Sequence, residues 1–214
     1  MDKGGMMYRH FGKRLVDIAA SGILLILLGP LLLVLAVLVR LIHGGPVLFR
    51  QERTGVRKQT FTILKFRTMT NECDANGTLL PDGQRLTRFG KFLRATSLDE
   101  LPELLNVLKG EMSLVGPRPL LPRYDNWYTE REATRFDVLP GITGWAQVNG
   151  RNDLAWDERL ECDAWYVEAC SAWLDIKILA LTVVKVLWRS NVQVNPDLSF
   201  GYLDEERRRL AEAK

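Results

Sequence analysis

The stretch Ile18–Val39, IAASGILLILLGPLLLVLAVLV, decides how this chain folds. Its 22 residues carry no charge. At ~1.5 Å per residue they form a helix long enough to cross a bilayer. The stretch is too long for the core of a typical signal peptide, and Arg40 follows directly where a cleavage site would need small residues. The sequence therefore predicts a membrane segment that is retained.

Charges on both sides of this segment predict that its two ends lie on one side of the membrane. The basic residues of the two flanks are Lys3, Arg9, Lys13 and Arg14 before it and Arg40, Arg50, Arg53, Arg57 and Lys58 after it. Lys and Arg concentrate in cytoplasmic flanks, so both ends are expected in the cytoplasm. Gly29-Pro30 offers a break, because proline lacks an N–H and clashes with the preceding turn. We expect a re-entrant helix–break–helix within residues 1–43; a single crossing helix and a buried soluble helix are the alternatives.

The composition predicts a folded body beyond the membrane segment. Hydrophobic residues make up 47% of the 214 residues, which argues against disorder. A net charge of only +3 argues against a nucleic-acid partner. The three cysteines Cys73, Cys162 and Cys170 form no C-x-x-C, which argues against a zinc site or a disulfide framework.

The pattern past the membrane segment predicts a mostly helical α+β domain with one small β-hairpin. Strands are expected at 46–50 and 59–69 around Gly55, followed by a polar loop at 71–83. Helices are expected at 86–95, 97–110, 130–136, 155–169 and 173–188. The last is either an interfacial helix with tryptophans at the headgroups or a core helix. We divide the chain into a membrane hairpin (1–43), a cytoplasmic domain (44–200) and a charged tail (201–214), itself helical or frayed.

Two adjacent carboxylates, Asp99 and Glu100, are the first candidates for chemistry. Ser97 is expected to cap a helix there, with Glu100 completing a capping box. The positive end of a helix dipole favours ionised carboxylates, which suit a nucleophile or a metal ligand. Acidic residues in a first helical turn are also common without any function.

Several cations surround this pair in the sequence. Lys65 and Arg67 lie on the second predicted strand, and Arg94 precedes Asp99 by about one turn. Arg118 stands between two prolines, which fix the direction of a guanidinium that can bind phosphate with two hydrogen bonds. Carboxylates among rigid cations would suit a metal-bound diphosphate, although any one cation could belong to a solvated basic face.

A third candidate segment is Pro140–Asn152, PGITGWAQVNGRN. We expect one loop whose glycines, side-chain amides and arginine contact a sugar, a uridine or a phosphate, with Gln147 and Arg151 as binding residues. The chain lacks the phosphate-loop, dinucleotide and zinc-protease motifs. Both histidines flank the membrane segment, which argues against a histidine-dependent triad.

Five ordered blocks are far more specific together than any one alone. They are KFRTM (Lys65–Met69), SLDELP (Ser97–Pro102), NVLKGEMSLVGPRPL (Asn106–Leu120), PGITGWAQVNGRN (Pro140–Asn152) and WLDIK (Trp173–Lys177). In this order they resemble the bacterial sugar transferase family, the monotopic phosphoglycosyl transferases. The resemblance runs from the basic N-terminus to about Val192, and the chain is similar to the small form of the family. The family's re-entrant helix commonly breaks at Ser-Pro, where this chain has Gly29-Pro30.

The resemblance implies a two-step reaction at the cytoplasmic face of the bacterial inner membrane. Asp99 would attack the sugar-linked phosphate of a UDP-sugar, releasing UMP. Polyprenol (undecaprenyl) phosphate would then take the phosphosugar, in the first membrane step of glycoconjugate biosynthesis. Mg²⁺ would be held partly by Asp99, and Glu100 matches a partner carboxylate with a metal or general-base role. The implied substrate-binding residues are Lys65, Arg67, Arg94, Arg118, Gln147, Arg151 and Asp175.

Two alternatives to this reaction remain open at the level of sequence. One is a membrane-tethered scaffold that grips anionic lipid headgroups without catalysis. The other is the same transfer without a covalent intermediate, with Asp99 serving only as a metal ligand. The expected partners are a UDP-sugar, polyprenol phosphate and membrane lipids, and tryptophan-rich surfaces leave room for a homodimer.

Overall fold

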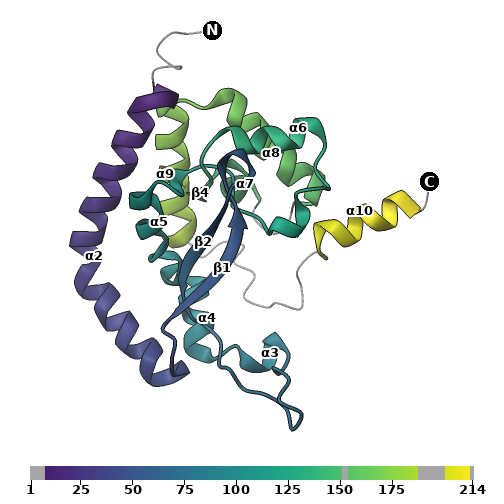
Figure 1. The fold of residues 1–214 in the computed structure, drawn as a ribbon. Coiled ribbons are helices and arrows are strands. Elements are labelled where there is room, and N and C mark those ends of the chain that lie inside the picture. The colour runs from purple at the N-terminus through teal and green to yellow at the C-terminus, as the bar shows by residue number, and fades with distance from the viewer. Residues whose placement is uncertain (1–7, 151–153, 188–200, 213–214) are drawn as a thin grey trace.

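A computed structural model describes residues 8–150, 154–187 and 201–212. A π-helical turn, Tyr8–Gly12, leads into the long helix α2, Lys13–His43. This helix confirms the predicted long apolar segment, and it bows around one side of the body (Figure 1). It runs unbroken through Pro30, so the expected interruption of the helix is not present. A proline removes one hydrogen bond and bends a helix without necessarily ending it.

The buried residues of helix α2 lie near its two ends. Its buried residues recur at four-residue spacing, one turn apart on one face: Lys13, Asp17 and Ser21 near the start, and Leu35, Val39 and His43 near the end. Between Ser21 and Leu35 no residue of α2 is buried. Only 11% of its most apolar 18-residue window is buried, which distinguishes it from the core helix of a soluble domain. The chain is therefore associated with a membrane through α2.

The predicted β-hairpin is confirmed, with shifted ends. Strand β1, Leu48–Thr54, pairs antiparallel with β2, Thr60–Phe66, and Leu48 lies opposite Phe66. The first strand starts and ends later than expected because its pairing continues through the polar residues before Gly55. A 3-10 turn, Val56–Lys58, joins the strands.

The chain then forms the predicted polar loop, followed by two short helices. Asn71–Gly83 contains turns and one isolated bridge between Cys73 and Leu79, and ends in α3, Asp82–Arg85. Helix α4, Arg88–Ala95, begins at Thr87, whose hydroxyl accepts from the Gly90 amide.

The helix expected from Ser97 to Gly110 is wrong in its first half. Residues Leu98–Glu100 form a 3-10 turn, η3, and α5 begins only at Glu103 and ends at Lys109. Ser97 caps nothing, because its backbone is left-handed with φ 55°. Pro102 occupies the N-cap position of α5.

A second sheet was not predicted. Strand β3, Ser113–Val115, pairs in parallel with β4, Gly141–Thr143. The segment expected as one loop from 140 to 152 is therefore β4 followed by α7, Trp145–Asn149. Three-residue strands are too short to show alternation of polar and apolar residues, so neither strand is recognisable from sequence.

The remaining helices complete the body. They are α6 (Glu130–Ala133) with the 3-10 turn Thr134–Asp137, the 3-10 turn Pro122–Tyr124, α8 (Trp156–Ala169), α9 (Ala172–Leu187) and α10 (Leu203–Glu212). The predicted helices at 130–136, 155–169 and 173–188 are confirmed within the described residues. On α9, Leu174 and Ile178 are buried while Trp173 and Val183 are exposed, so the helix has both a core face and an outer face.

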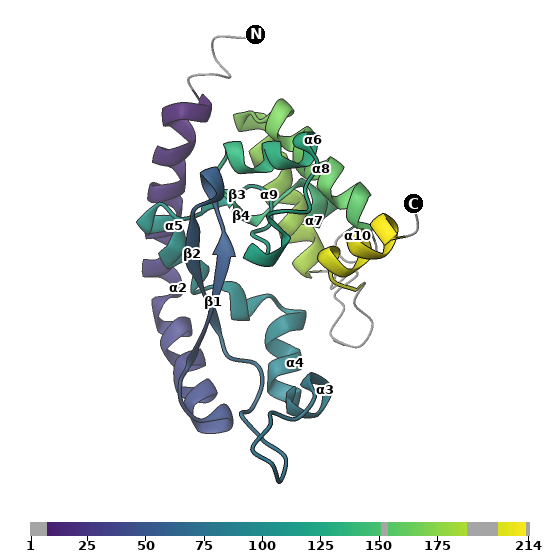
Figure 2. The ribbon, with the colours of Figure 1, turned by 45° about the vertical axis from the view of Figure 1, so that its right-hand side comes forward.

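The main core lies between the hairpin, α5 and the helices α8 and α9. Its central residues include Ile63, Val107, Val115, Tyr166 and Ile178. Figure 2 shows α2 along one side of this core and α10 on the other side. The core fixes η3, β3 and α9 relative to one another, and these elements border the candidate site.

Candidate active site

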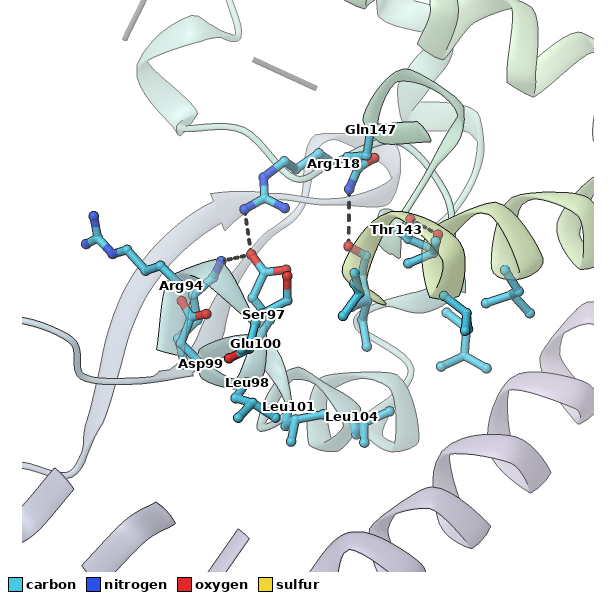
Figure 3. Close-up of a pocket in the computed structure, with 18 of the residues that line it drawn as sticks. Arg94, Ser97, Leu98, Asp99, Glu100, Leu101, Leu104, Arg118, Thr143 and Gln147 are labelled. Carbon is cyan, nitrogen blue, oxygen red and sulfur yellow. Dashed lines mark hydrogen bonds and ion pairs between the residues drawn. The ribbon is translucent and has the colours of Figure 1, made fainter. Parts of the chain in front are cut away.

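A pocket of about 690 Å³ lies where η3, β4, α7, α8, α9 and the middle of α2 meet (Figure 3). One part of its wall is apolar, from Leu24 and Leu28 of α2, Leu101 beside η3, and Leu179 and Val183 of α9. Its polar residues include all of the predicted Asp99, Glu100, Lys65, Arg94, Arg118 and Gln147. The pocket thus joins a charged region to a surface contributed by the membrane helix.

Glu100 is the centre of an ion-pair network. Its Oε1 lies 2.6 Å from Lys65 Nζ and 2.7 Å from an Nη of Arg118. Lys65 Nζ also lies 3.2 Å from the buried Glu103 carboxylate. Burial opposes the charge of Glu100, but Arg118 and Lys65 outweigh it and hold the pKa of Glu100 well below its usual range. Glu100 is therefore a fixed anion that positions two cations.

Asp99 has a different environment from its neighbour. The left-handed turn at Ser97 directs η3 so that both carboxylates face the pocket (Figure 3). Glu100 is paired, whereas no hydrogen bond or ion pair within 4.0 Å reaches Asp99 from the described residues. Burial first, and then the charge of Glu100, raise the pKa of Asp99 to about 6, against the opposing influence of Lys65, Arg94 and Arg118. The expected lowering by a helix dipole is wrong, because η3 is a single turn and Asp99 is not at the start of a long helix.

Arg94 and Gln147 keep polar groups available to a ligand. Arg94 donates from Nε to Thr68 Oγ1 at 3.0 Å, and its terminal nitrogens make no hydrogen bond within the described part of the chain. Gln147 donates from Nε2 to the Ile142 carbonyl at 3.1 Å, while its Oε1 is buried without a partner among the same residues. A buried amide oxygen without a donor is costly, so a ligand N–H or O–H would be favoured there.

Three predicted binding residues do not join this group. Arg67 is buried beside the end of α2, where it donates to the Gly45 carbonyl at 2.8 Å. Asp175, on α9, is buried against the start of α2. It accepts hydrogen bonds from Lys13 at 2.5 Å and from Tyr8 and Tyr166 at 2.7 Å. Neither residue lines the pocket. Arg151 lies outside the described residues.

The sequence reasoning missed three charged residues of the pocket: Arg135, Arg159 and Asp163. Arg135 pairs with Asp163 at 3.1 Å, and both side chains are buried. A signal was available on the predicted helix 155–169. Arg159 and Asp163 are one turn apart, next to Leu160 and Trp156, so charges stand at the edge of its apolar face.

The side chains of this site would hold a divalent cation through one carboxylate, with substrate phosphates and waters completing its ligands. Among the described residues no three carboxylate, histidine or cysteine side chains gather as a metal cage. Mg²⁺ usually takes one or two carboxylates and completes its shell with waters and substrate phosphates. Asp99, an unpaired carboxylate facing the pocket, is a suitable protein ligand of that kind.

Comparisons with known proteins match the chain to one family. A family model described as Bacterial sugar transferase matches residues 8–189. The chain is 54% identical over 181 residues to the protein named Uncharacterized sugar transferase EpsL of Bacillus subtilis (strain 168), an alignment that covers 85% of this chain and 90% of EpsL.

Two further relatives carry more specific names. The UDP-glucose:undecaprenyl-phosphate glucose-1-phosphate transferase of Caulobacter vibrioides is 42% identical over 191 residues, covering 84% of this chain and 71% of that protein. The Undecaprenyl-phosphate galactose phosphotransferase of Salmonella typhimurium is 40% identical over 197 residues, covering 84% of this chain and 41% of that protein. The chain thus spans most of EpsL and of the Caulobacter protein, and about two fifths of the Salmonella one.

Proposed function

The chain belongs to the bacterial sugar transferase family, and we propose that this transferase moves a sugar-1-phosphate from a UDP-sugar to polyprenol phosphate through Asp99. One observation carries the proposal. Asp99 is a carboxylate without a protein partner among the described residues, in a pocket that also presents Lys65, Arg94 and Arg118. Relatives named for glucose and galactose transfer make UDP-glucose and UDP-galactose the first donors to consider.

In the first step, an Asp99 oxygen attacks the sugar-linked phosphorus of the donor. A new P–O bond to the carboxylate forms, the bond from phosphorus to the bridging oxygen breaks, and UMP leaves with the electron pair. Lys65 and Arg94 bind the sugar-linked phosphate, and Arg118, directed by its two flanking prolines and by Glu100, stabilises the charge that develops. Asp99 would hold Mg²⁺, which would supply positive charge to offset the charge of the phosphates.

In the second step, an oxygen of polyprenol phosphate attacks the same phosphorus and Asp99 leaves as a free carboxylate. The product is a polyprenol diphosphate sugar. The leucines that α2 and α9 contribute to the pocket wall suit an isoprenoid chain, which is entirely apolar. The phosphate of that lipid would then reach Asp99 without leaving the membrane surface.

The position of α2 fits this arrangement if both of its ends lie on the cytoplasmic side. Its two buried stripes hold the ends against the body, and between them Leu24 and Leu28 line the pocket while no residue is buried. Basic flanks favour the same placement. With both ends on the cytoplasmic side, the continuous helix α2 would lie within the cytoplasmic leaflet of the inner membrane, and the pocket would lie at the boundary between the soluble donor and the lipid acceptor.

The test is release of UMP by purified protein with Mg²⁺ and undecaprenyl phosphate, across a panel of UDP-sugars. We expect lipid-dependent release with one donor, lost in Asp99→Asn. Asp137→Asn, which makes the same chemical change at an exposed carboxylate, should retain full activity. If no donor gives UMP from folded wild-type protein in a native-like membrane, the proposed reaction is wrong, and binding to anionic lipids becomes the property to measure.

A further inference from the structure

The charges that line the pocket do not balance. Five cations and three carboxylates face it. Glu100 pairs with Lys65 and Arg118, and Asp163 pairs with Arg135. Asp99 acts electrostatically on Arg94. For Arg159, no carboxylate lies within 4.0 Å among the described residues, so its charge has no protein partner there.

Arg159 is nevertheless held in a defined place, in the first turn of α8. Its guanidinium lies 4.7 Å from the centroid of the Trp156 ring, and one Nη donates to the Leu154 carbonyl at 3.3 Å. Trp156 is itself fixed, because its indole N–H donates to the Gly201 carbonyl at 2.9 Å and its ring meets Tyr124 edge-on at 5.6 Å. The stacking orients the guanidinium plane without neutralising it.

The surroundings of Arg159 favour an anion. Its Nε is buried and has no hydrogen-bond acceptor in the part of the chain that the structure describes. Burial lowers the pKa of Arg159, and the nearby charges of Arg118 and Arg135 lower it further, with Asp163 opposing them. A phosphate beside Arg159 would supply both the missing acceptor and the missing negative charge.

The reaction offers such a phosphate twice. In a phosphoryl transfer the attacking and leaving oxygens lie roughly in line on opposite sides of the phosphorus. When Asp99 attacks, the phosphate of UMP leaves from the side opposite Asp99. When the lipid phosphate attacks the Asp99 ester, it must come from that same side. Two different phosphates therefore occupy one position in turn.

We infer that Arg159, oriented by Trp156, is the phosphate subsite opposite Asp99, which holds the leaving UMP phosphate and then the attacking polyprenol phosphate. This inference rests on the proposed function. It divides four cations of the pocket by the phosphate that each one binds. Lys65 and Arg94 bind the transferred phosphate, Arg159 binds the UMP phosphate or the polyprenol phosphate, and Arg118 acts on both positions.

The test compares steady-state kinetics of wild type, Arg159→Gln and Arg159→Lys with both substrates varied. For Arg159→Gln we expect the KM for the UDP-sugar, the KM for undecaprenyl phosphate and the inhibition constant of UMP all to rise by roughly tenfold or more, since a charged hydrogen bond is lost. Arg159→Lys keeps the charge but not the planar fork, so smaller rises in all three are expected. Arg131→Gln is the matched control, because Arg131 is exposed and pairs with Glu161 and Glu168 on the outside of α8.

A purely structural role of Arg159 predicts a different result. Loss of the contact with Trp156 alone would lower the unfolding temperature and kcat and leave both KM values and UMP inhibition unchanged. That result, or a rise confined to one of the two substrates, would overturn the shared subsite. If Arg159→Gln does not fold, the Arg159→Lys comparison decides by the same criteria. Absence of transfer in wild type would instead refute the proposed function.

Discussion

Asp99 and Glu100 are neighbours in sequence with opposite electrostatic environments. Glu100 is held ionised by Lys65 and Arg118, whereas Asp99 is buried beside that anion and its pKa rises to about 6. A carboxylate with a raised pKa is a stronger nucleophile when ionised, and at neutral pH most of it is ionised. In the proposed reaction, Asp99 is therefore the nucleophile, while Glu100 is the anion that positions Lys65 and Arg118.

The raised pKa of Asp99 predicts that the pH profile of kcat/KM has a descending limb on its acid side. Because only the ionised carboxylate attacks, kcat/KM for the UDP-sugar should fall as pH drops through about 6, by about tenfold per unit below it. The measurement is the pH profile of initial rates of UMP release. In Glu100→Gln the anion that raises this pKa is gone, so the limb should move to lower pH.

Glu103 provides the control for that profile. Burial raises the pKa of Glu103 to about 7, so it titrates close to the same range. In Glu103→Gln the limb near pH 6 should remain. If the fall of kcat/KM near pH 6 disappears in this variant, the titrating group is Glu103. The pH profile would then not support Asp99 as the nucleophile.

The structure shows which of the predicted site residues line the pocket and which are used elsewhere in the fold. Lys65, Arg118 and Gln147, from three of the sequence blocks, join Asp99 and Glu100 in the pocket, and so does Arg94, which precedes Asp99 in the sequence. Arg67, from the block of Lys65, and Asp175, from the block Trp173–Lys177, instead hold the two ends of α2 against the body. A charged residue in a motif looks the same in sequence whether its partner is a substrate or another buried side chain.

At the scale of elements, the error at Ser97 has a physical cause. The sequence Ser97-Leu98-Asp99-Glu100 satisfies the capping pattern, but Pro102 and the left-handed Ser97 produce a 3-10 turn before α5. Capping patterns describe local hydrogen bonds, and tertiary packing can override them. The override is useful here, because it directs both carboxylates into the pocket (Figure 3).

The position of α4 predicts a strong effect of one glycine. A Cβ at Gly90 would lie 1.8 Å from the Thr68 carbonyl oxygen, so α4 would have to move away from Thr68. Arg94 is also on α4 and donates to the Thr68 hydroxyl, so this shift would displace Arg94 from the pocket as well. Gly90→Ala should lower the free energy of unfolding by about 1–3 kcal/mol or more and reduce kcat/KM. Thermal unfolding in detergent and UMP release measure the two effects.

Gly22→Ala is the matched control for this change. A Cβ at Gly22 meets nothing within 4 Å, and alanine favours a helix over glycine. Its unfolding temperature and activity should equal those of wild type or exceed them. Equal stability of Gly90→Ala and Gly22→Ala would show that α4 does not depend on the close contact with Thr68.

At the scale of the whole molecule, Asp175 joins the start of α2 to α8 and α9. Lys13 and Asp175 are both buried, and Tyr8 and Tyr166 donate to the same carboxylate. Asp175→Asn leaves the Lys13 charge buried without a partner, which should cost about 3–5 kcal/mol of unfolding free energy. Lys13→Met combined with Asp175→Asn should cost less than Asp175→Asn alone. An equal or larger loss in the double variant would contradict the ion pair as the reason.

The path of α2 through the membrane gives a further whole-molecule prediction. Phe11 and Leu41 are exposed near the two ends of α2. In a variant without native cysteines, Phe11→Cys and Leu41→Cys should both resist a membrane-impermeant maleimide in intact spheroplasts and react after lysis. Labelling of one site in intact spheroplasts would indicate a helix that crosses the bilayer.

The covalent role of Asp99 is the central claim, and one measurement tests it most directly. Wild-type protein is incubated with a UDP-sugar labelled at the sugar-linked phosphate and with Mg²⁺, without lipid, then quenched and digested. We predict label on the peptide that contains Asp99, released UMP in equal amount, and transfer of that label to undecaprenyl phosphate when the lipid is added. Unlabelled protein from a preparation that turns over fully with lipid would contradict the account and indicate direct transfer between the two substrates.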